Sequence, residues 1–366
     1  MKMRDERRKN VFKNDGDDEN VENLVFPKPS EDAIIYVDYM YENMIVDSGN
    51  ISKLVSYEDW RYFKKKMCNN CEEIQFTNVS VFVQACSSSM IHEKNSVANI
   101  ISTILVDFLV VFSEVEILDL VRFCKENISH PVVSNFFSHM ISIVTIPVGI
   151  SFPVVLYQSG ESFLISLNAI VDKACEYEIC TPQIAQRIMN VNIPLSFTTL
   201  SNMKFSHSQL IKYSCYDYAL KSIESDNKNM VSCALYFLSK FLELDETRRN
   251  VIEKYMVVIN SGLYHMKLIV LSILNNEIGA FSYEEITYLV DSGIIEIIEN
   301  ILLSFTDRLF EQKIINTIQL LTYIVRHNEV SKNLITKELY DTMDGFLIDQ
   351  SVELVSSTRE FLELFF

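Results

Sequence analysis

Short amphipathic segments recur at a nearly constant spacing in the C-terminal half of the chain. This recurrence constrains the fold more than any other feature of the sequence. When the segments SQLIKY, RNVIEK, ITYLVD and KNLITK are aligned, one apolar residue of each falls in the same column. These residues are Ile211, Ile252, Val290 and Ile335, separated by 41, 38 and 45 positions. Because a unit of this size cannot bury its apolar face alone, neighbouring units must stack into a continuous core.

The segments around this column follow the period of an α-helix. Three apolar faces show it: Val231, Ala234, Leu235, Leu238, Phe241 and Leu242; Ile294, Ile297, Ile298, Ile301 and Leu302 after Gly293; and Ile314, Ile318, Leu321 and Val325. With 8 Gly and 7 Pro in 366 residues, the chain lacks the turn residues of an all-β sandwich or a loop-rich α/β enzyme. We therefore predict an all-α, right-handed superhelical solenoid of the armadillo/HEAT type over residues 31–366, with roughly seven or eight repeats.

Three-helix repeats of this type present a ladder of third helices on the concave face of the solenoid. We assign to that ladder the segments 75–88, 194–205, 231–242, 266–276 and 313–325. The period alone does not define repeat boundaries in residues 31–195.

Residues 1–30 form a predicted flexible arm and linker in which the charge changes sign. Residues 1–13 carry six Lys and Arg against Asp5 and Glu6, whereas residues 14–32 carry seven Asp and Glu against Lys28. The arm ends in the stiff, helix-breaking sequence FPKPS. A solvated tail explains such a segment equally well.

The net charge of −17 limits the classes of ligand that the protein is expected to bind. It repels phosphate backbones and anionic lipids and attracts basic ligands, so we expect no nucleic acid and favour Lys- and Arg-rich peptides. Residues 131–160 carry no Asp, Glu, Lys or Arg, but Ser, His, Pro and Gly interrupt the stretch. Buried helices are therefore a better interpretation than a membrane span.

No pattern of catalytic or metal-ligating residues is present. The sequence lacks a Gly-rich phosphate loop, an H-E-x-x-H pair and a nucleophile elbow, and its six His are scattered. Cys68 and Cys71 form a C-x-x-C without a second pair at zinc spacing. We predict no enzyme activity, no metal and no cofactor. The free cysteines and the charged N-terminus favour a reducing compartment.

Several segments resemble the importin-alpha family. Residues 274–302 are similar to a late repeat of that family, residues 73–88 to an early one, and residues 339–366 to the closing one. The start of the arm matches the family pattern R-x-x-x-F-K-N-x-G-x-D. The matching residues are Arg8, Phe12, Lys13, Asn14, Gly16 and Asp18.

The resemblance implies a nuclear import adaptor that shuttles between cytoplasm and nucleus. Such an adaptor binds basic nuclear localisation signals in a concave acidic groove. Its arm links this cargo to an importin-beta-type carrier, and an export factor is a further implied partner. Here Phe12 would anchor in an apolar pocket while Arg8 and Lys13 meet acidic residues of the carrier. The family's long basic helix is replaced by the acidic ENVENLVFPKP, so only the first anchoring segment is retained.

Importin-alpha grips its cargo through repeated Trp-x-x-x-Asn pairs on the third helices. The single Trp60 lies outside any such motif. The matched positions are Ser80 and Gln84, Thr198 and Asn202, Tyr236 and Lys240, and Ser272 and Asn276. Since most aromatic positions are lost, a second interpretation stays open: an armadillo/HEAT scaffold for protein–protein interaction without classical signal recognition.

Overall fold

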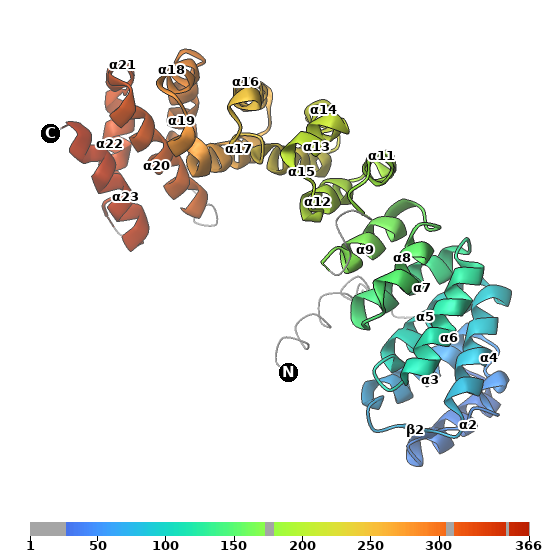
Figure 1. The fold of residues 1–366 in the computed structure, drawn as a ribbon. Coiled ribbons are helices and arrows are strands. Elements are labelled where there is room, and N and C mark those ends of the chain that lie inside the picture. The colour runs from blue at the N-terminus through green and yellow to red at the C-terminus, as the bar shows by residue number, and fades with distance from the viewer. Residues whose placement is uncertain (1–26, 173–178, 305–310, 349–350, 366) are drawn as a thin grey trace. The chain divides into compact units, whose positions relative to one another are not determined.

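The computed structural model describes residues 27–172, 179–304, 311–348 and 351–365 (Figure 1). The described chain is helical except for one two-stranded parallel sheet, which confirms the predicted all-α array. Contacts divide it into two compact units, with the boundary between Thr145 and Ile146. The first described helix begins at Glu31, directly after the predicted linker.

Unit 1 consists of helix pairs joined by short connections. Helices α3, α5 and α7 contact one another in succession and form one row, while α4 contacts α6 beside it. The elements are α2 (Glu31–Glu42), β1 (Ile45–Val46), η1 (Ile51–Lys53), α3 (Tyr57–Met67), η2 (Cys68–Asn70), β2 (Gln75–Phe76), α4 (Val79–His92), α5 (Asn95–Phe108), α6 (Glu114–Asn127) and α7 (Pro131–Ile143).

An aromatic cluster forms the core of unit 1 around β2. Strand β2 pairs in parallel with β1, with Val46 opposite Phe76. The Phe76 ring lies 5.0 Å from Phe82 and 5.2 Å from Phe108. The prediction of a helix over residues 75–88 was therefore wrong at its start, because this pairing keeps the chain extended before α4 begins.

Unit 2 is also helical and contains a longer row. Helices α9, α12, α15, α17, α20 and α23 contact one another in succession, and we call them the unit 2 row. Their bounds are Gly160–Ile170, Pro194–Asn202, Lys228–Ser239, Tyr264–Glu277, Glu311–His327 and Val352–Leu362. The remaining elements are α8 (Val148–Val155), α11 (Pro182–Val191), α13 (His207–Lys212), α14 (Cys215–Ser222), α16 (Asp245–Ser261), η3 (Ile278–Ala280), α18 (Tyr283–Asp291), α19 (Ile294–Leu303), α21 (Glu329–Lys332), α22 (Lys337–Gly345) and η5 (Glu363–Phe365).

The apolar faces read from the sequence are buried in unit 2. All six residues of the face from Val231 to Leu242 are in the core, as are Ile314, Ile318 and Leu321. Gly293 connects α18 to α19 with a φ of 85°, a left-handed conformation that side chains with a Cβ disfavour. This glycine allows the two helices to follow each other directly.

The aligned column of apolar residues is only partly equivalent in the structure. Ile252 and Val290 are buried on α16 and α18. Ile211 on α13 is 37% exposed, and Ile335 lies in the connection between α21 and α22 rather than on a helix. The fourth alignment was therefore wrong, because a short apolar segment matches a helical pattern even where Asn333 and Thr336 cap the neighbouring helices.

Arg248 stabilises the connection between α15 and α16. Its side chain is buried and donates hydrogen bonds to the carbonyl oxygens of Leu242 and Glu243. The guanidinium also lies 2.8 Å from the carboxylate of Asp245 and 3.6 Å from that of Glu285 on α18. Arg248 thus satisfies carbonyls at the end of one repeat and reaches the next.

We expect Arg248→Met to lower the free energy of unfolding by about 3 kcal/mol, because it leaves Glu285 and two carbonyls without their buried partner. The measurement is urea denaturation followed by circular dichroism. Arg249→Met is the control. Arg249 is exposed, pairs with Glu253 and stacks 3.5 Å from the Tyr288 ring centroid, so its loss should cost less than about 1 kcal/mol. Equal effects would contradict this role for Arg248.

Asp59 joins the first two helices of unit 1. Its carboxylate accepts hydrogen bonds from the backbone N–H of Ser30 at 2.8 Å and of Ser56 at 3.0 Å. Burial alone would raise the pKa of Asp59, but these N–H donors outweigh it and hold the pKa below the usual 3.8.

We expect Asp59→Asn to destabilise the protein by about 2 kcal/mol at neutral pH. Because the folded-state pKa is depressed, the contribution of the carboxylate is present above pH 3.8 and is lost as the pH falls below that value. Urea unfolding at neutral pH and at about pH 3 should therefore show a difference from wild type that shrinks in acid. Glu58→Gln, one residue earlier, is the control. A difference independent of pH would contradict the assignment.

Candidate functional site

Polar side chains join neighbouring helices at the surface of the unit 2 row. The Asn168 amide on α9 donates to the Thr199 hydroxyl on α12 at 2.8 Å. The Asn202 side-chain amide donates in turn to the side-chain oxygen (Oδ1) of Asn168 at 3.0 Å. Both α9 and α12 therefore present an amide at their contact, and each amide is oriented by the other.

The same arrangement recurs between α17, α20 and α23. The Asn316 side-chain amide donates to the Ser272 hydroxyl at 3.0 Å. The Asn275 side-chain amide donates to the side-chain oxygen (Oε1) of Gln319 at 3.3 Å. The Gln319 amide continues to the Ser357 hydroxyl at 3.5 Å. We call the five carboxamide side chains the amide ladder: Asn168, Asn202, Asn275, Asn316 and Gln319.

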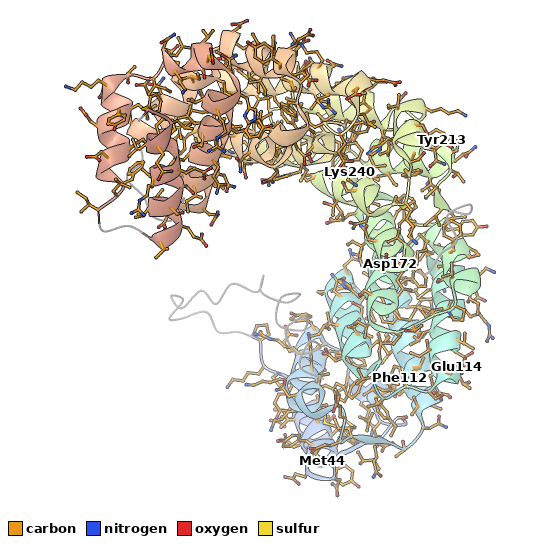
Figure 2. All side chains as sticks on the ribbon, turned by 60° about the vertical axis from the view of Figure 1, so that its left-hand side comes forward. Met44, Phe112, Glu114, Asp172, Tyr213 and Lys240 are labelled. Atoms are coloured by element: carbon orange, nitrogen blue, oxygen red, sulfur yellow. The ribbon has the colours of Figure 1, made fainter. Side chains whose placement is uncertain are left out.

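Lys240 takes the place of an amide where α12 meets α15 (Figure 2). Its ammonium donates to the Ser201 carbonyl oxygen in the last turn of α12, at 2.8 Å. The side chain is half-buried, and desolvation lowers the pKa of Lys240. On the other side of α15, the Ser232 hydroxyl contacts the Met266 sulfur at 3.4 Å.

Six of the groove residues predicted from the sequence lie on or next to helices of the unit 2 row. Asn202 and Ser272 take part in the polar contacts between helices. Thr198 and Asn276 are exposed, and Tyr236 is 54% exposed on α15. Lys240 is the C-cap residue of that helix.

Ser80 and Gln84 lie in unit 1, and their assignment to the peptide groove stays a prediction. Both lie on α4, which contacts α5, α6 and α7. The Ser80 hydroxyl lies 3.5 Å from the Glu116 carboxylate on α6. Unit 1 is built from helix pairs, in which an amphipathic pattern does not reveal which partner belongs to which row.

Four members of the amide ladder were not predicted from the sequence: Asn168, Asn275, Asn316 and Gln319. A signal for three of them was available. Asn316 and Gln319 have the same i, i+3 spacing as Ser272 and Asn275. This spacing places the two residues of each pair on one face of their own helix. Asn168 carries no comparable local signal.

The acidic groove that the importin-alpha resemblance implies stays a prediction, because the charges on the row helices nearly balance. These helices carry Glu161, Glu277, Glu311, Glu353 and Glu360 against Lys228, Lys267, Lys313, Arg326 and Arg359, with Lys240 at the end of α15. The excess acidic residues lie instead on the flanking helices α18, α19 and α22. They are Glu284, Glu285, Asp291, Glu296, Glu299, Glu338, Asp341 and Asp344, against Lys337 alone.

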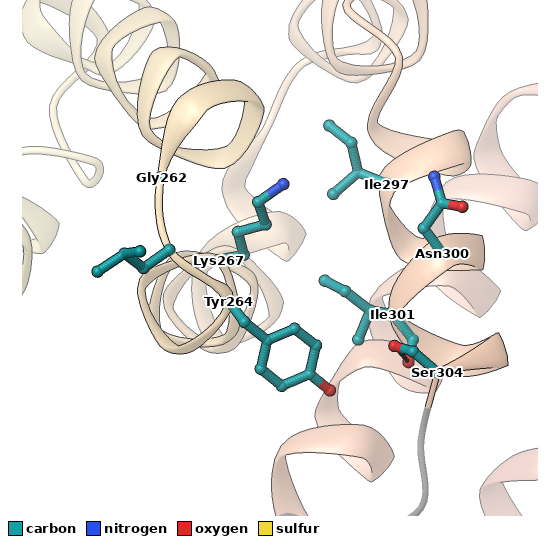
Figure 3. A pocket seen from close by; sticks show the side chains of 8 residues that line it. Gly262, Tyr264, Lys267, Ile297, Asn300, Ile301 and Ser304 are labelled. Atoms are coloured by element: carbon teal, nitrogen blue, oxygen red, sulfur yellow. Dashed lines mark hydrogen bonds between the residues drawn. The ribbon is translucent and has the colours of Figure 1, made fainter.

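A shallow cavity of about 390 Å³ lies between the start of α17 and α19 (Figure 3). Tyr264 and Lys267 face Ile297, Asn300 and Ile301 across it. Its lining is mostly apolar and brings no acid, base and nucleophile together.

Several cysteines lie in surroundings that suppress thiolate formation. Burial raises the pKa of Cys215 to about 12 and raises the pKa values of Cys68, Cys86 and Cys124 further. At neutral pH these thiols are protonated and poor nucleophiles. Within residues 27–172, 179–304, 311–348 and 351–365, no three His, Cys, Asp or Glu side chains gather at metal-binding distance. None of the helices in those ranges is long and apolar enough to cross a bilayer.

The arm residues Arg8, Phe12, Lys13, Asn14, Gly16 and Asp18 lie outside the described residues. Their assignment as a carrier-binding motif therefore stays a prediction.

No protein-family model and no curated protein sequence matches the chain. Solved structures do match. An engineered protein aligns over 92% of this chain and 99% of its own, at 12% identity and a TM-score of 0.53. A structure described under an interaction between cadherin and beta-catenin aligns over 78% of this chain, at 12% identity and a TM-score of 0.52. The chain spans 61% of the length of that protein.

The chain has an armadillo-repeat fold. At this identity the comparisons establish the fold and do not distinguish importin-alpha from other armadillo proteins. The function must therefore be argued from the surface of the unit 2 row.

Proposed function

We propose that this armadillo protein is a non-enzymatic scaffold that holds an extended segment of a partner protein along the unit 2 row. The amide ladder carries the proposal. Carboxamides are both donors and acceptors, so they can pair with the N–H and C=O groups of a peptide backbone wherever a row helix presents one.

The geometry of the row suits an extended chain. Packed helices lie about 8–10 Å apart, and an extended chain advances roughly 3.3 Å per residue. A row helix therefore passes a backbone group about every two to three residues, and α9, α12, α17 and α20 each present at least one amide of the ladder there. The bonds between Asn168 and Asn202 and between Asn275 and Gln319 hold these amides in place. Each carboxamide has further donor or acceptor capacity for a ligand.

Side-chain recognition on this row is weaker than backbone recognition. Tyr236 is the exposed aromatic residue at a predicted groove position. Tyr323 on α20 stacks on His327 with ring centroids 4.0 Å apart, so one face of its ring is already covered. A row with amides and few open aromatic rings should tolerate many peptide sequences.

We expect the double substitution Asn202→Ala and Asn316→Ala to weaken peptide binding about tenfold, because two backbone contacts are lost. The probe is a labelled peptide selected on the full-length protein from a random library, with binding followed by fluorescence anisotropy. Gln186→Ala is the matched control, since the exposed Gln186 on α11 contacts Asn190 and lies off the row.

An unchanged affinity in the double variant, or an equal loss in Gln186→Ala, would remove the row as the binding site. Circular dichroism of each variant shows whether the fold is retained.

A second candidate function is nuclear import, in which the protein shuttles between cytoplasm and nucleus as an adaptor for basic cargo. The arm motif from Arg8 to Asp18 favours it, as do Asn202 and Asn276 at matched positions of the row. Its partners would be an importin-beta-type carrier, basic localisation signals and an export factor.

In this candidate, Phe12→Ala should abolish capture of the carrier, because the arm loses its apolar anchor. The measurement is a pull-down of importin-beta by the full-length protein at moderate salt, with Val11→Ala as the control. A parallel binding assay uses a classical basic signal peptide. Binding of neither importin-beta nor the signal peptide would exclude the adaptor role while leaving the scaffold proposal intact.

A further inference from the structure

Lys240 introduces a cation at the step between α12 and α15, whereas the α9–α12 and α17–α20 steps present neutral amides. We infer that this step of the row selects a peptide carrying Asp or Glu, and that Lys240 is the specificity-determining residue. The inference rests on the proposed binding of an extended peptide along the unit 2 row.

The ammonium of Lys240 is only partly compensated. It donates to the Ser201 carbonyl oxygen at 2.8 Å, and no carboxylate of the described residues lies within ion-pair distance of it. An ammonium has three N–H donors, so this bond leaves two. A half-buried cation that has lost water without gaining a counter-charge favours an incoming anion.

The two helices that meet at Lys240 carry no carboxylate. Helix α12 has no charged residue, and Lys228 is the only charged residue within α15. The neighbouring row helices carry their carboxylates at Glu161, at the start of α9, and at Glu277, at the end of α17. A Lys or Arg of the partner would therefore meet an uncompensated positive charge at this step and be disfavoured.

Asn202 completes the geometry of the step. It is the residue after Ser201 and bonds to Asn168. An extended peptide that crosses α12 beside this amide passes the Lys240 ammonium. A carboxylate there can accept a charge-assisted hydrogen bond from the ammonium while the Asn202 carboxamide meets the peptide backbone.

The opposing account is that Lys240 only stabilises the C-terminal end of α12, where an ammonium interacts favourably with helix carbonyls. In that case replacing the residue changes stability and leaves the charge preference of bound peptides unaffected. Charge preference and stability are therefore measured separately.

The test is selection of a random peptide library, of about twelve residues per peptide, on the full-length protein and on three variants. Lys240→Gln keeps a polar side chain and removes the charge, and Lys240→Glu reverses it. Lys212→Glu is the matched control, because Lys212 is exposed on α13, off the row. Thermal unfolding of each variant reports its stability.

We expect peptides selected on wild type and on Lys212→Glu to be enriched in Asp and Glu. The enrichment should disappear with Lys240→Gln and change to Lys and Arg with Lys240→Glu. Synthetic versions of one selected peptide with Glu or Lys at the enriched position should differ about tenfold in affinity for wild type, and this difference should vanish in Lys240→Gln.

The outcomes separate this inference from the proposed function. Selected peptides with no acidic preference, or a preference that persists in Lys240→Gln, would overturn the role of Lys240 and leave the scaffold function standing. Enrichment of basic peptides on wild type would overturn it in favour of import-type recognition. Failure to select any peptide that needs Asn202 and Asn316 would overturn both proposals. If Lys240→Glu does not fold, the comparison of peptides selected on wild type and on Lys240→Gln still tests the role of Lys240.

Discussion

The helix-on-helix packing of the unit 2 row is the constraint on which the rest of that unit depends. Each of α12, α15, α17 and α20 contacts a row helix on both sides, so its apolar residues are buried only while both neighbours are present. Leu200, Leu235, Leu271 and Leu321 illustrate this, since each is fully buried. Stability in such an array is shared between adjacent repeats rather than stored within one.

This packing also determines where polar groups can lie. Once the apolar face of a row helix is buried, its remaining positions are at the surface or at the edge of a helix contact. The amides of Asn168, Asn275 and Asn316 occupy the edges and bond to the neighbouring helix. They are therefore held by rigid elements, which is what a site for an extended peptide requires.

Much of this organisation could be predicted from the sequence, and the failures have physical reasons. The helical faces from Val231 to Leu242 and from Ile314 to Val325 were found because burial imposes a helical period on the residues. The row of helices to which Ser80 belongs could not be predicted, because amphipathic helices of either row carry the same pattern. The bonds of the amide ladder join residues 31 to 44 positions apart, and no local pattern encodes such contacts. The clustering of acidic residues on α18, α19 and α22 was not predicted either, because a net charge contains no information about where the charges lie.

The uneven distribution of charge within unit 2 has a consequence for how a partner arrives. Helices α18, α19 and α22 carry a strong excess of acidic residues, while the charges of the row beside them nearly balance. An anionic segment diffusing toward this unit is repelled by one set of helices and not by the other, so most productive encounters begin with the row already facing it. Added salt screens this field over about 10 Å. Orientation during encounter, and hence the association rate, should respond to ionic strength more than the lifetime of the bound state does.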